Sequence, residues 1–273
     1  MERERESQSQ SQSQRERERE REKIAKRVID IPDVHIPDQD SRALAATLLG
    51  IQILKPDVVV ILGDFLTLDP VSIHRKHRHN EVDIAKEIEE GNSVLDMLGQ
   101  VSRFNKKKTS QVHYLEGNHE YRLEMYRANE AKAVGGILPS IPQLLRLEQR
   151  GYTWWPYEEQ RYRSLAIGKI LFIHGWGASE HHAKSNLIRC GKNLVYGHTH
   201  DHQVYSLRQY GDDRSAFCDG WLGDARKAKY LKNPDRWRHG FGVTDFKPNG
   251  NFTHYFIPIL HGEFIWAGRI YRA

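Results

Sequence analysis

Apolar and polar residues follow one another along this chain in blocks typical of alternating strands and helices. Short apolar runs predict β-strands at residues 26–31, 57–64, 111–119, 169–175 and 193–200. The second run, DVVVILGD, is almost wholly apolar, which is typical of a strand buried on both faces. Apolar positions at helical spacing predict helices over 38–54 and 80–103, and a further helix is expected over 120–134. This alternation predicts an α/β fold, with β-hairpins in the last third of the chain, at 240–259.

The first 23 residues differ in composition from the rest of the chain. Arg-Glu repeats flank a Ser-Gln repeat, and no apolar residue lies between Met1 and Ile24. Such a stretch cannot bury apolar surface, so we expect residues 1–23 to be a disordered low-complexity tail and residues 24–273 to form one domain. The tail holds 7 basic and 7 acidic residues, so the net charge of +5 belongs to residues 24–273. That excess suits a polyanionic partner, but many unrelated proteins carry the same charge.

Cysteine content and hydropathy indicate the setting of the protein. Cys190 and Cys218 are its two cysteines, which do not make a disulfide framework in a chain of 273 residues. No run approaches the roughly 20 apolar residues needed to cross a membrane, and the N-terminus lacks the apolar segment of a secretory signal. We therefore expect a reducing, cytoplasmic setting and no membrane partner. The oligomeric state stays open.

The five predicted strands end in residues that a simple turn does not need. Their ends read Asp-Val-His, Gly-Asp, Gly-Asn-His, His-Gly and Gly-His-Thr-His, and functional residues gather at such strand ends in α/β proteins. Carboxylate, amide and imidazole donors without thiolates suit Mn²⁺, Fe²⁺, Zn²⁺ or Co²⁺. Seven ligands exceed the needs of one ion, so two ions sharing Asp64 are expected; the alternative is a chance collection of capping and core residues. The candidate ligands are Asp33, His35, Asp64, Asn118, His174, His198 and His200.

In this order, the motifs resemble those of the calcineurin-like metallophosphoesterase superfamily, whose pattern is D-x-H, G-D, G-N-H-E/D, H and G-H-x-H. The resemblance spans residues 28–260 and implies a four-layered αββα sandwich, with two mixed sheets flanked by helices and two divalent ions at the sheet edge. Mn²⁺ is the expected ion, with Fe, Zn, Co or Ni as alternatives. The resemblance implies one ion on Asp33, His35, Asp64 and His200, and the other on Asp64, Asn118, His174 and His198.

The same resemblance implies roles in catalysis. His119 would contact the substrate phosphate or protonate the leaving oxygen, and Asn118 would face both metal and substrate. Arg122, one helical turn further on, either reaches the phosphate or lies exposed on the helix. Gly117 is expected to permit a tight turn between strand and helix.

Departures from the pattern bear on the substrate. Ser/Thr protein phosphatases carry G-D-x-x-D-R-G, whereas this chain has Thr67 and Leu68 at the positions of the second Asp and the Arg. The chain looks more like small phosphoesterases of bacteriophages and bacteria, which implies the cytoplasm of a bacterial or phage-infected cell. We expect a phosphodiesterase, either a nuclease or an enzyme acting on cyclic nucleotides. The alternatives are a phosphomonoesterase, a protein phosphatase, or a non-catalytic nucleic-acid-binding protein.

Several further residues permit two interpretations each. The basic segment 74–80 is either a lid that grips a polyanion or a solvated loop. His181 and His182 are expected on a solvent-facing helix start, and Trp154 and Trp155 in the core rather than stacked on a base. Asp201 and His202 either support the metal ligands or form a turn, and segment 218–224 is expected near the metals.

Overall fold

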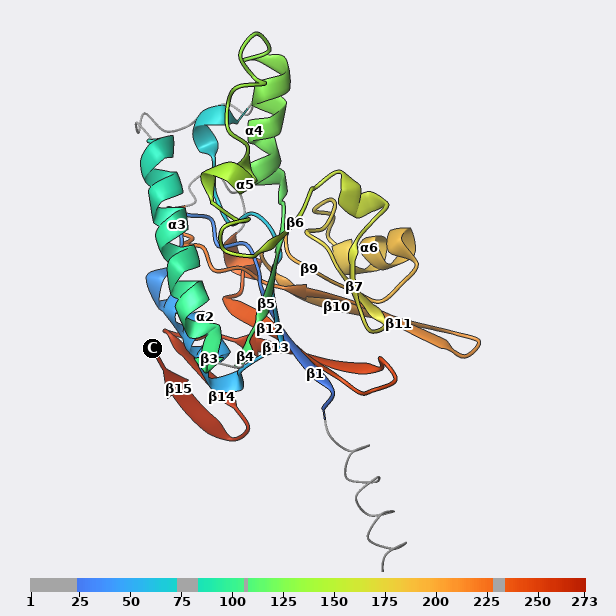
Figure 1. Cartoon of the computed structure of the whole chain (residues 1–273). Coiled ribbons are helices and arrows are strands. Elements are labelled where there is room, and N and C mark those ends of the chain that lie inside the picture. Colours follow the sequence, from blue (N-terminus) through green and yellow to red (C-terminus); the bar gives the residue numbers. More distant parts are fainter. Residues whose placement is uncertain (1–23, 73–82, 106–107, 228–233) are drawn as a thin grey trace, which may run out of the picture.

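Two mixed β-sheets lie face to face in the computed structural model, which describes residues 24–72, 83–105, 108–227 and 234–273 (Figure 1). The larger sheet has the strand order β13-β12-β1-β2-β5-β6, and the smaller has the order β10-β11-β9-β8-β7. The larger sheet contains β1 (Lys26–Ile31), β2 (Val58–Ile61), β5 (Gln111–Leu115), β6 (Thr153–Trp155), β12 (Gly240–Phe246) and β13 (Phe252–Pro258). The smaller sheet contains β7 (Leu165–Ile167), β8 (Ile170–Phe172), β9 (Leu194–Tyr196), β10 (His202–Gln209) and β11 (Asp212–Asp219). The expected tail and the basic segment 74–80 lie outside the described residues.

Helices cover the outer face of each sheet and complete the four layers. α2 (Ser41–Leu54) and α3 (Ile84–Val101) cover the larger sheet, and α6 (His182–Cys190) covers the smaller (Figure 1). Asp40 and Asp83 directly precede α2 and α3. Each side chain accepts hydrogen bonds from two backbone amides in the first turn of its helix, which stabilises the helix start. The predicted αββα sandwich is confirmed.

β2 is buried on both faces, as its uninterrupted apolar sequence predicts. Val59 and Ile61 pack into the core beneath α2 and α3, whereas Val58 and Val60 pack into the core between the two sheets. β2 pairs in parallel with β1 on one side and with β5 on the other. The three strands therefore deliver their carboxyl ends to the same edge of the sheet.

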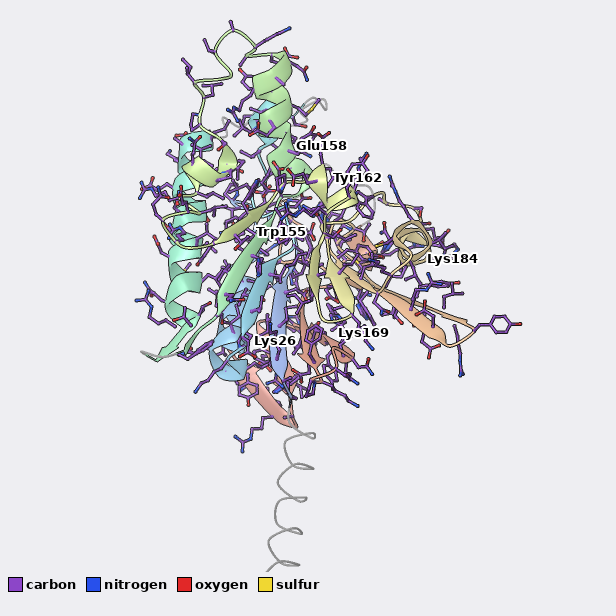
Figure 2. The ribbon with its side chains drawn as sticks, turned by 45° about the vertical axis from the view of Figure 1, so that its right-hand side comes forward. Lys26, Trp155, Glu158, Tyr162, Lys169 and Lys184 are labelled. Atoms are coloured by element: carbon purple, nitrogen blue, oxygen red, sulfur yellow. The ribbon has the colours of Figure 1, made fainter. Side chains whose placement is uncertain are left out.

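Trp154 and Trp155 are partly buried and pack against the core, in line with the expected core role. They are neighbours on β6 and point to opposite faces of the sheet (Figure 2 labels Trp155). Trp154 packs on Tyr114, with ring centroids 5.2 Å apart. The Trp155 indole donates to His113 Nδ1 at 3.2 Å. Neither tryptophan is therefore assigned a base-stacking role.

The remaining elements complete the chain. The helix expected over 120–134 is α4 (Asn118–Asn129), which starts two residues earlier and stops before a series of turns. β12 and β13 form the hairpin predicted near the C-terminus. Within the described ranges, no helix is long and apolar enough to cross a membrane. Short elements are η1 (Asp69–Val71), β3 (Arg103–Asn105), β4 (Lys108–Thr109), α5 (Ile141–Leu144), η2 (Glu159–Arg161), η3 (Pro234–Arg236), β14 (Glu263–Trp266) and β15 (Arg269–Arg272).

Candidate metal centre

The structure brings all seven predicted ligand side chains together where strands of the two sheets end. Asp33 and His35 follow β1, Asp64 follows β2, and Asn118 follows β5. From the smaller sheet, His174 follows β8, and His198 and His200 follow β9. Six of the seven, all except the amide, form two groups of donor atoms that share Asp64.

The first group contains Asp33, His35, Asp64 and His200, and all four side chains are buried. The Nε2 atoms of His35 and His200 lie 3.0 Å apart, and His200 Nε2 lies 3.7 Å from Asp33 Oδ1. Ligand atoms about 2.0–2.2 Å from a common ion lie about 3 Å from one another, so this spacing fits coordination of one cation.

The second group contains Asp64, His174 and His198, and Asn118 completes it. The Asn118 side-chain oxygen lies 2.9 Å from His174 Nε2 and 2.7 Å from His198 Nδ1. Asp64 Oδ1 lies 3.4 Å from His174 Nε2. An amide oxygen, a carboxylate oxygen and two ring nitrogens therefore converge on one point, and these residues could hold a second cation.

Neighbouring groups fix the orientation of the ligands. His174 Nδ1 lies 2.8 Å from the Leu62 carbonyl oxygen, and this contact leaves Nε2 as the ring nitrogen that could bind a metal. The His198 amide donates to both oxygens of Asp33, at 2.9 and 2.8 Å. Asp64 Oδ1 accepts from the His119 amide at 2.9 Å. The donor atoms are therefore held in place by the surrounding backbone.

Charge in the buried centre favours a cation. Burial lowers the pKa of His35 and His200 well below the usual histidine value, so both imidazoles are neutral at pH 7, the form that can bind a metal. Burial opposes ionisation of Asp64 and His174, yet their mutual attraction lowers the pKa of Asp64 well below its usual value and raises that of His174 to about 9. A bound cation would take over the positive charge that His174 carries here.

Five of the proposed ligands have left-handed backbone conformations, which residues with side chains rarely adopt. Such conformations cost on the order of 1–3 kcal/mol each and cluster at functional sites. The positive φ angles, from 28° to 72°, belong to Asp33, His35, Asp64, His198 and His200. The fold therefore accepts backbone strain in order to aim these side chains.

Gly117 is needed for a different reason from the one its sequence suggests. Its φ of −93° and ψ of 177° are open to any residue, so the expectation of a glycine-dependent turn is wrong. A Cβ at this position would instead overlap Asp64, and one at Gly197 would overlap the Asp33 carboxylate. These glycines let the backbone approach the metal ligands closely.

Glu120 organises the centre, although the sequence suggested no role for it beyond a place in the motif. Its carboxylate accepts hydrogen bonds from the amides of Asp64, Leu66 and Gly117 at 2.8–3.0 Å and from the Tyr114 hydroxyl at 3.1 Å. One buried side chain thus ties the loop after β2 to the loop after β5. The acidic residue in Gly-Asn-His-Glu was the available signal.

His119 and Arg122 lie beside the ligands, on α4. The His119 ring is buried, and its Nε2 lies 3.8 Å from Asp64 Oδ2 and 2.9 Å from Arg122 Nη2. Arg122 Nη1 donates to the Thr67 carbonyl at 3.0 Å and lies 3.4 Å from Asp69 Oδ1. The Arg122 side chain is 16% exposed, so it folds towards His119 instead of lying free on the helix.

His182 lies in the interior, so the expectation that it faces solvent is wrong; its neighbour His181 is exposed. The His182 ring lies 2.6 Å from the Tyr196 hydroxyl and 2.9 Å from Asp201 Oδ1. Asp201 in turn accepts from the Thr199 hydroxyl at 2.9 Å. This network supports the loop that carries His198 and His200. It agrees with the interpretation in which Asp201 supports the candidate ligands.

His202 and segment 218–224 complete the surroundings. His202 is exposed, and its ring stacks on Phe256 with centroids 4.1 Å apart. Segment 218–224 lies beside the ligands, as expected. The Leu222 amide donates to the Asp33 carbonyl at 2.9 Å, and the Trp221 indole stacks on the ring of His200 at 4.9 Å.

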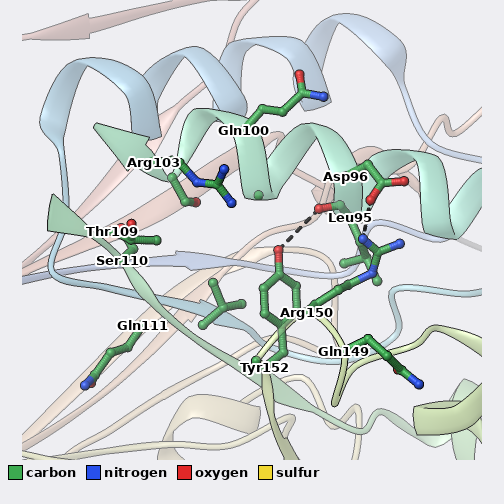
Figure 3. A pocket seen from close by; sticks show the side chains of 14 residues that line it. Leu95, Asp96, Gln100, Arg103, Thr109, Ser110, Gln111, Gln149, Arg150 and Tyr152 are labelled. Atoms are coloured by element: carbon green, nitrogen blue, oxygen red, sulfur yellow. Dashed lines mark hydrogen bonds and ion pairs between the residues drawn. The ribbon is translucent and has the colours of Figure 1, made fainter. Parts of the chain in front are cut away.

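A surface hollow of about 700 Å³ lies elsewhere on the molecule (Figure 3). It is lined by residues of α3, by Gln111 at the amino end of β5, and by Tyr152, whose hydroxyl donates to the Leu95 carbonyl. The candidate ligand Asn118 instead follows the carboxyl end of β5. The hollow is therefore separate from the candidate metal centre.

Two packed mixed sheets, with a donor set at their strand ends that could hold metal ions, fit the class of phosphoesterases. The chain belongs to the calcineurin-like phosphoesterase family, whose model matches residues 26–256. Membership places the protein among hydrolases that act on phosphoesters.

The chain is also similar to several phage proteins and to several solved structures. The Gene 54 proteins of Mycobacterium phages L5 and D29 are each 26% identical over 91% of this chain and 100% of their own length. Vacuolar protein sorting 29 from Cryptosporidium parvum is 16% identical, with a TM-score of 0.46 over 92% of this chain and 100% of its own. The E. coli phosphoesterase Yfce is 14% identical, with a TM-score of 0.37 over 84% of this chain and 98% of its own.

Proposed function

We propose that residues 24–273 form one phosphoesterase domain with a dinuclear metal centre that cleaves phosphodiesters. The observation that carries this proposal is the shared position of Asp64 in two converging donor groups. One ion would be held by Asp33, His35, Asp64 and His200, and the other by Asp64, Asn118, His174 and His198. The mixed oxygen and nitrogen donors suit Mn²⁺ best, with Fe, Zn, Co or Ni as alternatives.

When bound, the two cations would neutralise the substrate phosphate and lower the pKa of an attacking water. The protein itself supplies preorganised ligands and a buried imidazole beside them. Its strained loops hold the donor atoms before the ions arrive, which reduces the reorganisation that binding requires.

His119 is the proposed catalytic residue. Burial lowers the pKa of its imidazole to about 4 in the absence of substrate. An anionic phosphate next to Nε2 would raise that pKa, because a negative charge favours the protonated ring. The ring could then donate a proton to the departing oxygen. Asn118, His119 and Arg122 together form the proposed phosphate contact.

A preference for diesters rests on the limited positive charge that the protein offers. Thr67 and Leu68 stand where protein phosphatases have an Asp and a phosphate-gripping Arg, and among the described residues Arg122 is the cationic side chain in contact with His119. A diester carries one negative charge and needs less compensation than a monoester dianion. Nucleic acids and cyclic nucleotides are the proposed substrates, in the cytoplasm of a bacterial or phage-infected cell.

The test compares hydrolysis of bis-p-nitrophenyl phosphate with that of p-nitrophenyl phosphate, in Mn²⁺ and then in EDTA. We expect faster cleavage of the diester, loss of activity with EDTA, and loss of metal and activity in Asp64→Ala. A faster monoester reaction would favour the phosphatase alternative. Salt-sensitive nucleic-acid binding without turnover would favour a non-catalytic binding protein.

A further inference from the structure

A third group of potential ligands lies between the two sheets and plays no part in the centre described above. Asp30 belongs to β1 and His254 to β13 of the larger sheet, and Asp219 ends β11 of the smaller sheet. Their donor atoms all lie within 4.8 Å of one another. Asp30 and Asp219 are wholly buried, and the His254 side chain is 1% exposed.

The Asp30 carboxylate is aimed into this group, beside Asp219 and the backbone of Gly242. Neither of its oxygens accepts a hydrogen bond of ordinary geometry from the described part of the chain. A buried carboxylate without donors or a cation is strongly destabilising. Burial and the nearby Asp219 raise the pKa of Asp30 well above its usual value, and burial raises that of Asp219 to about 7. The pair therefore ionises fully only where positive charge comes from another source.

His254 is positioned as a ligand and supplies little charge itself. Its Nδ1 lies 2.9 Å from the Thr244 hydroxyl, and its Nε2 lies 3.0 Å from Asp219 Oδ2. Burial lowers the pKa of His254 to about 4, so the ring is neutral at pH 7. A metal-ligating histidine is oriented in the same way, with one ring nitrogen held by a neighbour and the other facing the ion.

Gly242 makes room for this arrangement. A Cβ at this position of β12 would overlap one oxygen of Asp219 and both oxygens of Asp30. The strand passes so close to the two carboxylates that only glycine fits there. The close approach gathers both carboxylates beside His254 Nε2.

We propose that Asp30, Asp219 and His254 bind a divalent cation of the Mn²⁺ or Zn²⁺ class, separate from the catalytic ions. A proton shared by the two carboxyls would satisfy one oxygen of Asp30 and leave the other without a hydrogen bond of ordinary geometry from the described residues. A cation contacted by both oxygens satisfies the whole carboxylate. Two carboxylates and one imidazole match the preferences of these ions.

The location gives this cation a structural role beneath the catalytic centre. Asp30 precedes Asp33 by three residues, and Asp219 precedes Trp221, which stacks on His200, by two. A cation here would join the two sheets at the strands that carry or support catalytic ligands. The proposal does not depend on the catalytic metals, because its test compares variants with the wild type.

The test measures the metal content of the full chain by inductively coupled plasma mass spectrometry, after loading with Mn²⁺ or Zn²⁺ and desalting. Asp30→Asn and Asp219→Asn are expected to hold one ion per chain fewer than the wild type. Asp245→Asn is the matched control, because Asp245 lies on the adjacent β12 and pairs with Arg27, and it should hold as much metal as the wild type. Asp64→Asn should lose catalytic metal and keep this ion.

Equal metal content in the wild type, Asp30→Asn and Asp219→Asn would overturn the proposal and assign the pair a shared proton. Anomalous scattering from wild-type crystals soaked in Zn²⁺ provides a test that needs no variant. A peak between Asp30, Asp219 and His254 supports the cation. Peaks confined to the catalytic ligands refute it.

Discussion

The Nδ1 atom of His119 lies 2.8 Å from the backbone carbonyl oxygen of Thr67. Ser/Thr protein phosphatases have an Asp at the position of Thr67, and that Asp orients the catalytic histidine. In this chain the backbone carbonyl provides the hydrogen bond that holds the ring. The loss of the Asp therefore leaves His119 oriented, with Nε2 facing the metal centre.

Replacement of His119 by alanine should slow catalysis and leave the metals bound. The ring supplies no atom to either donor group, but proton transfer in the transition state contributes about 10²–10⁴-fold. We expect kcat to fall by this order, most strongly for substrates with poor leaving groups, and metal content to stay at the wild-type level. Thr67→Ala is the control, because it keeps the carbonyl that orients His119.

A metal-free His119→Ala protein would contradict the acid role and make His119 a support for the ligands. A large loss in Thr67→Ala would show that its side chain, which has no hydrogen-bond partner within the described residues, matters through packing.

Removal of the Arg122 guanidinium should weaken phosphate binding. Arg122 lies 2.9 Å from His119 Nε2, so its charge would face a phosphate held beside that ring. We expect Arg122→Ala to lower kcat/KM by about 10–150-fold, the range for loss of one charged hydrogen bond of about 1.5–3 kcal/mol. Arg127→Ala is the matched control on the same helix, because Arg127 pairs with Glu124. Equal steady-state constants for the two variants would exclude a phosphate contact.

Asp201 should affect metal affinity without contacting a metal. It lies next to His200 in the chain, and its Oδ1 accepts a hydrogen bond from the Thr199 hydroxyl and lies 2.9 Å from His182 Nε2. Loss of partners that orient ligands typically weakens metal binding by about 10–100-fold. We expect this loss in Asp201→Asn and His182→Phe by calorimetric Mn²⁺ titration. His202→Ala, which alters an exposed ring, should bind as the wild type does, and unchanged affinity in Asp201→Asn would refute the supporting role.

The sequence predicted the strands, the main helices and the candidate ligands because these depend on local patterns, whereas the four layers were implied by the family resemblance. The apolar run of β2 indicates burial on two faces, and Asp64 follows it at the point where parallel strands present functional groups. These inferences need only the strand and the residue at its end.

Contacts between distant segments could not be predicted in the same way. Glu120 accepts hydrogen bonds from backbone amides up to 56 residues away in the chain, and the sequence around Glu120 does not specify these partners. His182 was expected to face solvent because a helix start is usually exposed, but packing of α6 on the smaller sheet buries its first residue. Tertiary packing determines the hydrogen-bond partners and the burial of these residues, and local sequence carries little information about that packing.

Stability should depend on pH through Glu87, a buried residue of α3. One of its oxygens accepts the amides of Thr67 and Leu68 at 2.8 and 2.7 Å, and burial raises its pKa from 4.5 to about 8. The folded protein therefore keeps a proton that the unfolded chain releases. The stabilising contribution is complete below pH 4.5 and is lost as the pH rises towards and through 8.

Glu87→Gln keeps the accepting oxygen and removes the ionisation. We expect its free energy of unfolding to match the wild type near pH 5 and to exceed it by about 1–3 kcal/mol at pH 9, the cost of a poorly solvated polar group. Urea denaturation at the two pH values measures this difference, with Glu89→Gln as an exposed control on the same helix. If Glu87→Gln is destabilised equally at both pH values, the carboxylate is charged throughout, and its hydrogen bonds to the loop after Asp64 outweigh the effect of burial.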